Sequence, residues 1–183
     1  TVTIGGNRYI ATVQSDLTWS VNVPESVLTA LGNGDLTVTA SVTNGVGNSG
    51  SAERDITIDA NLPGLRVDTV AGDDVINSIE HGQNLIVTGS SDGLAAGTTL
   101  TVTVNGKTYP ATVLADGTWR AAIPAADVGA LAAGTVTVTV AGQSSAGNPV
   151  SISHDVTVDL ATVAISIDAI AADDVINAAE KGA

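Results

Sequence analysis

The chain repeats itself at an offset of one hundred residues, and this repeat constrains the fold more than any other feature. Thr1–Gln83 align without a gap with the residues one hundred positions later. The residues that match in the two copies include Gly6, Tyr9, Asp16, Trp19, Pro24, Leu31, Gly34, Asn48, Asp55 and Asp59. The period is too long for helical solenoids or leucine-rich repeats, so each repeat is expected to be one whole domain of a tandem array.

Within each repeat, apolar residues alternate with threonine, which is typical of half-buried β-strands. Leu100–Val104 and Val136–Val140 both follow this pattern, and Asn105-Gly106 is a strong hairpin-turn signal. In the second repeat we expect strands near Leu65–Asp68, Leu85–Thr88, Leu100–Val104, Tyr109–Val113, Thr118–Ala122, Val136–Ala141 and Val150–Val158. About seven short strands in about 95 residues predict an all-β fold of immunoglobulin-like sandwich repeats.

The repeat boundaries divide the chain into four parts. Residues 1–59 are expected to be the C-terminal part of a first repeat that lacks its two opening strands, 60–63 a linker, and 64–159 a complete repeat. Residues 160–183 are expected to hold a second linker, then the first strand and acidic loop of a third repeat. The incomplete first repeat should be frayed or completed by another chain. Pro124–Leu131 and the stretch from Asp73 to Glu80 are expected to form short helical turns.

Composition narrows the function classes. The net charge is −13, with 19 acids against 6 bases, which argues against nucleic-acid binding and against attraction to anionic membranes. The absence of cysteine excludes disulfides and thiolate metal sites. No apolar run approaches the ~20 residues of a membrane helix, and no signal-peptide pattern is present, so no membrane insertion is expected in this segment. We expect the sequence to be part of a longer protein.

An acidic motif recurs at the repeat boundary, running from Asp68 to Gly82 and again from Asp168 to Gly182. Seven acids lie between Glu53 and Glu80, and Ca²⁺ is the hard cation expected to neutralise such a cluster. Mg²⁺ is less suited, because it requires a tighter octahedron. The candidate metal ligands are Asp59, Asp68, Asp73, Asp74, Asn77, Glu80, Asp92, Asp159, Asp168, Asp173, Asp174, Asn177 and Glu180. The alternative is that these side chains are solvated loop residues and caps.

Topology suggests how such a site would assemble. The first and last strands of a seven-strand sandwich run toward the same pole, so the loop Ala71–Gly82 should meet the chain exit at Asp159. The loops at the other pole, which contain Asp92, Asp116 and Asn148, should face the preceding repeat. A cation at each junction would turn repulsion between abutting repeats into attraction and straighten the array.

The remaining conspicuous residues favour structural roles. Trp19 and Trp119 occupy matched strand positions and are expected in the core, and the hydroxyls of Tyr9 and Tyr109 are expected to reach backbone partners. The two histidines, His81 and His154, do not match between repeats. No catalytic constellation recurs, so we do not expect an enzyme.

Several motifs together resemble the bacterial immunoglobulin-like repeats of giant, type I-secreted adhesins and biofilm-associated proteins of Gram-negative bacteria. They are Asp73–Glu80, Val104–Tyr109, Ala115–Trp119, Ala146–Asn148 and His154–Asp159. The resemblance implies a cell-surface fibre of β-sandwich repeats made rigid by interdomain Ca²⁺ and exported without a cleaved signal. The family linker often reads Asp-x-Thr-Ala-Pro, from which both linkers here depart, and the second has no proline.

Our leading hypothesis is therefore a calcium-binding extender module of a bacterial cell-surface adhesin that supports cell adhesion and biofilm formation. Its partners would be the neighbouring repeats of the same chain. Two alternatives stay open. In the first alternative, the repeats themselves bind a host glycan or protein. In the second, they self-associate with other adhesin fibres through exposed β edges.

Overall fold

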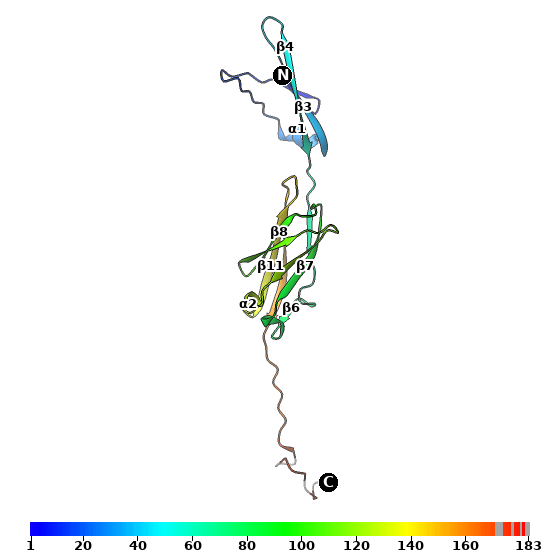
Figure 1. The fold of residues 1–183 in the computed structure, drawn as a ribbon, viewed down its shortest axis with the longest axis vertical. Coiled ribbons are helices and arrows are strands. Elements are labelled where there is room, and N and C mark those ends of the chain that lie inside the picture. Colours follow the sequence, from blue (N-terminus) through cyan, green and yellow to red (C-terminus); the bar gives the residue numbers. More distant parts are fainter. Residues whose placement is uncertain (171–173, 177, 180, 182–183) are drawn as a thin grey trace.

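A computed structural model of the chain describes residues 1–170, 174–176, 178, 179 and 181. In Figure 1 two groups of strands follow one another along the long axis, and a short linker joins them. Residues 160–170 leave the second group at the end opposite the linker. We call residues 1–59 the first repeat and residues 64–159 the second repeat; these boundaries stay a prediction.

The second repeat contains two facing sheets. One has the strand order β10-β7-β5 and the other β6-β12-β11-β8-β9. The strands are β5 (Gly64–Val67), β6 (Val75–Asn77), β7 (Leu85–Asp92), β8 (Thr99–Val104), β9 (Lys107–Thr112), β10 (Thr118–Ile123), β11 (Gly134–Gln143) and β12 (Pro149–Asp159). Two short helices, η1 (Glu80–Gly82) and α2 (Ala125–Val128), complete it. The expected all-β sandwich is thereby confirmed.

The core lies between the two sheets because alternate residues of each strand point inward. In β8, Leu100, Val102 and Val104 are buried while the threonines between them are largely accessible. From the facing sheet, Val87 and Trp119 pack into the same cluster. The indole N–H of Trp119 donates to the carbonyl of Ser90 (3.2 Å), so its polar atom is satisfied inside the core.

The predicted strands of the second repeat all form, with boundaries shifted by a few residues. The predicted turn from Asp73 to Glu80 is partly wrong. Val75–Asn77 form the short strand β6, which pairs in parallel with β12, and only Glu80–Gly82 are helical. The predicted turn at Pro124–Leu131 is present as α2, over the shorter range Ala125–Val128.

The first repeat contains a single sheet of order β2-β1-β3-β4 over residues 2–58. Its elements are β1 (Val2–Ile4), β2 (Asn7–Tyr9), α1 (Glu25–Ala30), β3 (Gly34–Thr43) and β4 (Ser49–Ile58). Within residues 1–59, no strand corresponds to β5, β6, β7 or β10. The sheet therefore leaves one face open, as an apolar groove of about 220 Å³ lined by Val2, Trp19 and Ala40 among others.

The open face overturns the prediction that Trp19 is a core residue. Trp119 is 1% exposed, as predicted, but Trp19 is 45% exposed. Trp119 packs against Gly89 of β7, and residues 1–59 contain no counterpart of that strand. Residues 18–23, which match β10, form no strand either, so burial of this tryptophan depends on the sheet β10-β7-β5 being formed.

The expected backbone partners of the tyrosine hydroxyls are also not found. Tyr109 donates to the carboxylate of Asp127 (2.9 Å), which also accepts from Lys107. Val27 occupies the position matching Asp127 in the first repeat, and the buried hydroxyl of Tyr9 has no hydrogen-bond partner. The carboxylate on α2 therefore ties this helix to β9 in the second repeat only.

This tie predicts a pH dependence of stability. Hydrogen bonds from Lys107 and then Tyr109 lower the pKa of Asp127 below its ordinary value of 3.8. A carboxyl with a depressed folded-state pKa contributes stability that is present above its unfolded pKa and lost as pH falls through the folded pKa. We expect Asp127→Asn to lower the melting temperature at pH 7, and the difference from wild type to shrink as pH falls below 3.8.

Thermal unfolding followed by circular dichroism between pH 7 and pH 2.5 checks this expectation. Lys107→Gln, which removes one of the two partners, should have a smaller effect in the same direction. A difference between wild type and Asp127→Asn that stays constant over the whole pH range would contradict it.

None of the helices in the described part of the chain is long and apolar enough to cross a membrane.

Candidate functional site

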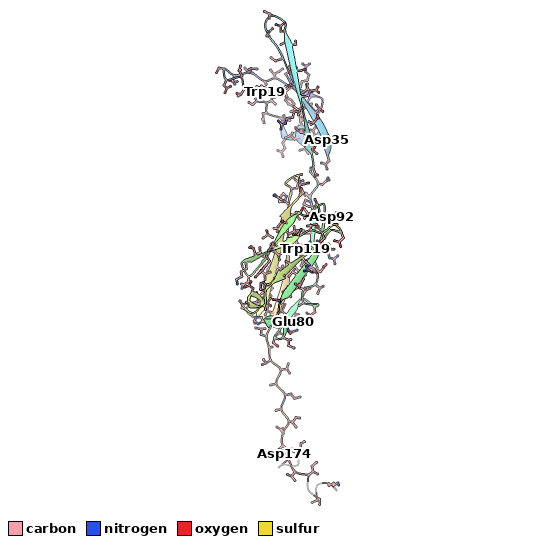
Figure 2. The ribbon with its side chains drawn as sticks, in the orientation of Figure 1. Trp19, Asp35, Glu80, Asp92, Trp119 and Asp174 are labelled. Carbon is pink, nitrogen blue, oxygen red and sulfur yellow. The ribbon has the colours of Figure 1, made fainter. Side chains whose placement is uncertain are left out.

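The acidic loop and the chain exit meet at one pole of the second repeat, as the topology predicted. The parallel pairing of β6 with β12 places Asn77 opposite Asp159, and the Thr157 N–H donates to the Asp74 carbonyl (2.9 Å). In Figure 2 Glu80 lies at this end of the repeat, where the chain leaves it. We call this end, formed by the loop Ala71–Gly82 and Asp159, the exit pole.

The opposite end receives the linker from the first repeat, and we call it the entry pole. Asp92 ends β7 there, pairing with Gly64 directly after the linker. Figure 2 shows Asp92 at the end of the second repeat that faces the first. The side chain of Asn148 also reaches the linker, donating to the carbonyls of Asp59 (2.9 Å) and Asn61 (3.0 Å).

The side chains of the acidic loop are largely engaged with its own backbone. Asp73 accepts from the Val75 N–H (3.0 Å). Asn77 accepts from the N–H groups of Ile79 and Glu80, while Glu80 accepts from the Asn77 N–H (3.1 Å). These reciprocal bonds resemble a capping box and fix the conformation of the loop.

Asp74 is held at the centre of this loop. Its backbone has a positive φ of 62°, which aspartate tolerates better than most residues. One carboxylate oxygen accepts from the Val70 N–H (2.8 Å) and lies 2.7 Å from Nε2 of His154 on β12. The hydrogen bond with His154, followed by that from Val70, lowers the pKa of Asp74. His154 therefore fastens the loop to the last strand, a role that the sequence did not reveal.

The linker aspartates have a common local geometry. Asp59 accepts from the Asn61 N–H (3.0 Å), and Asp159 accepts from the Ala161 N–H (2.9 Å). Each leaves its second carboxylate oxygen without a hydrogen bond to the described residues. The same holds for the second oxygen of Asp73, so these groups are chemically able to face a cation.

Not every candidate ligand reaches a junction. Asp68 follows β5 and accepts from the Thr88 hydroxyl (2.9 Å) in the middle of the sheet. Four residues of extended chain, about 13 Å, separate Asp68 from Gly64 at the end of the linker. The structure therefore does not bring Asp68 to Asp59. Asp168 makes no side-chain hydrogen bond to the described residues. Asp174 accepts from the Ile170 N–H (2.9 Å), just as Asp74 accepts from the Val70 N–H. Asp173, Asn177 and Glu180 lie outside the described residues.

The described part of the chain contains no group of three or more acidic or histidine side chains placed to hold a metal. The donors at the exit pole nevertheless fit a hard cation chemically. They are carboxylate and amide oxygens with backbone carbonyls nearby, the ligands that Ca²⁺ takes.

Neither a protein-family profile nor a curated protein sequence matches the chain. Several solved structures do match the chain. A calcium-stabilised adhesin that helps an Antarctic bacterium reach out and bind ice is 30% identical, with a TM-score of 0.51 over 97% of this chain. A 1.5-MDa bacterial ice-binding adhesin, studied for its retention at the host cell surface, is 30% identical over 87% of this chain, with a TM-score of 0.48. The chain spans 44% and 52% of the lengths of these two structures.

A third structure is a bacterial immunoglobulin-like domain from the M. primoryensis ice-binding adhesin. It is 32% identical, and the match covers all of that domain and 55% of this chain, with a TM-score of 0.43. The chain belongs to the bacterial immunoglobulin-like repeats of large adhesins. It is a structural adhesin module.

Proposed function

We propose that this chain is an extender segment of a large bacterial cell-surface adhesin, made rigid by Ca²⁺ at the junctions between its repeats. The observation that carries the proposal is the parallel pairing of β6 with β12, which puts the acidic loop beside the chain exit. One of the similar structures is itself described as calcium-stabilised. In the whole protein, such segments would project a binding tip and support adhesion and biofilm formation after type I secretion from a Gram-negative cell.

At the exit pole, Asp73 and Asp159 would supply carboxylate oxygens, and Asn77 and Glu80 would add further oxygens from the same loop. At the entry pole, Asp59 and Asp92 would contribute. Ca²⁺ accepts six to eight oxygens in loose geometry, including carbonyls and water, so side chains already bonded on one oxygen remain usable. The bound cation would offset the mutual repulsion of carboxylates on adjoining repeats and so fix the angle between them.

Isothermal titration calorimetry of the whole chain with CaCl₂ tests this function. We expect saturable binding with a dissociation constant on the order of 10⁻⁴ to 10⁻³ M, the range of extracellular calcium modules, and weaker binding of Mg²⁺. Asp159→Asn should weaken Ca²⁺ binding at least several-fold. Asp155→Asn is the matched control, since it removes the same charge from the same strand where the carboxylate bonds to Thr137.

Absence of saturable heat with CaCl₂, or equal loss of binding in the two variants, would refute a junction site. Small-angle scattering provides a second readout. Adding EDTA should broaden the distribution of distances within the chain, because the part of the chain after Asp159 then pivots about the second linker.

A further inference from the structure

The first linker is held by three asparagines, contributed by both repeats and by the linker itself. Asn33, in the first repeat, accepts from the Ala60 N–H (2.9 Å) and donates to Oδ1 of Asn61 (2.9 Å). Asn148, in the second repeat, donates to the carbonyls of Asp59 and Asn61 (2.9 and 3.0 Å). Both polar atoms of the Asn33 side-chain amide are therefore hydrogen-bonded. The side-chain oxygen and the backbone carbonyl of Asn61 are hydrogen-bonded as well.

Apolar packing reinforces these contacts on the second repeat. Pro63 ends the linker and is buried. It lies against Gly93, which adopts a φ of +72° in the turn after β7; a Cβ added at Gly93 would lie 3.3 Å from the Cα of Pro63. The linker therefore contacts the entry pole through both hydrogen bonds and a close backbone approach.

The second linker lacks these groups. The residues that match Asn33 and Asn61 are Ala133 and Ala161, and Val163 replaces Pro63. Among the described residues, only the local hydrogen bond from the Ala161 N–H to Asp159 recurs in the second linker. Val163 is 97% exposed. The two junctions therefore differ in residues that carry no charge and do not depend on a cation.

We propose that Asn33, Asn61 and Asn148 form an asparagine clamp, an interaction surface that docks the first linker onto both flanking repeats without metal. All of its hydrogen bonds join neutral amide and backbone groups. It gives the first junction an orientation set by the protein itself. At the second junction, Ala133 and Ala161 replace two of the three asparagines, so the orientation of that junction depends on other contacts. This proposal does not rest on calcium binding.

The Ala60 amide hydrogen reports directly on the clamp, because its acceptor is the Asn33 side chain. We expect slow exchange of this amide, measured by NMR in the presence of EDTA. Asn33→Ala should accelerate the exchange by roughly three- to tenfold, the factor that corresponds to one net hydrogen bond. Asn48→Ala is the matched control: it removes the side chain at the position that matches Asn148 and should leave exchange at Ala60 unchanged.

The orientation of the repeats gives a second readout. Because the chain has no cysteine, Val46→Cys and Ala130→Cys place one fluorophore on each repeat at exposed positions. In EDTA, single-molecule energy transfer should show one narrow population in this background. Asn148→Ala should broaden it, with the amide spectrum of the second repeat showing that the fold is retained.

Two results would overturn the clamp: Ala60 exchange that is already fast in EDTA, or exchange and energy transfer that Asn33→Ala and Asn148→Ala leave unaltered. A clamp that persists while CaCl₂ gives no binding heat would support this inference and refute the calcium function. The two proposals therefore fail separately.

Discussion

Replacing Trp119 by alanine is expected to lower the free energy of unfolding of the second repeat by about 3–5 kcal/mol, the usual cost of removing a large buried aromatic side chain. The side chain is 1% exposed and lies between the sheets. The truncation removes its packing and also leaves the Ser90 carbonyl without its indole donor. Chemical denaturation followed by far-ultraviolet circular dichroism measures the change.

Trp19→Ala provides the matched control, because the same residue type at the same repeat position is 45% exposed. It should leave the unfolding transition of the second repeat within about 0.5 kcal/mol of wild type. Equal shifts of this transition in the two variants would show that burial in the formed sheet β10-β7-β5 does not determine the contribution of this tryptophan.

Gly89→Ala is expected to destabilise the second repeat by about 1–3 kcal/mol or more, because a side chain there overpacks the core. An added Cβ would lie 2.0 Å from the Arg66 carbonyl oxygen and 2.3 Å from Cζ2 of Trp119. One of these neighbours is backbone in the adjacent strand β5, so relief requires β5 and β7 to separate. Differential scanning calorimetry should show a lower melting temperature.

Gly82→Ala makes the same chemical change where an added Cβ meets no atom within 4 Å. Its melting temperature should stay close to that of wild type. If Gly89→Ala were as stable as Gly82→Ala, the close packing of Trp119 against β7 would be wrong.

The strands of the second repeat could be predicted because their pattern is local. Each Val-Thr alternation specifies which face is buried, and the Asn105-Gly106 turn specifies a hairpin. The one-hundred-residue offset then predicts the division into domains, which stays a prediction. These signals require no knowledge of the partner strand, which explains why the all-β sandwich could be read from a single sequence.

Features that depend on distant partners could not be predicted in this way. β6 has three residues, too few for a periodic pattern, and forms because β12 offers a parallel edge. Trp19 is exposed because residues 1–59 contain neither a strand matching β10 nor a counterpart of its neighbour β7. The carboxylate partner of Tyr109 lies eighteen positions away on α2.

The candidate site was predicted in part. Sequence reasoning placed the acidic loop beside Asp159, and the structure confirms that placement. It did not reveal that Asp73, Asp74 and Glu80 each bond to backbone N–H groups of their own loop. It also missed His154 and the asparagine clamp, because uncharged or unmatched residues give no pattern until the fold brings them together. Whether the remaining oxygens bind Ca²⁺ stays a prediction.

The parallel alignment of β6 with β12 has a mechanical consequence. Tension on a surface fibre would enter the second repeat at Gly64 and leave it at Asp159, at opposite ends of the sandwich (Figure 1). The pull would then run along the strands, so the hydrogen bonds between β12 and both β6 and β11 would be sheared together instead of unzipped one by one. Such a geometry resists extension, because many bonds must break in the same event.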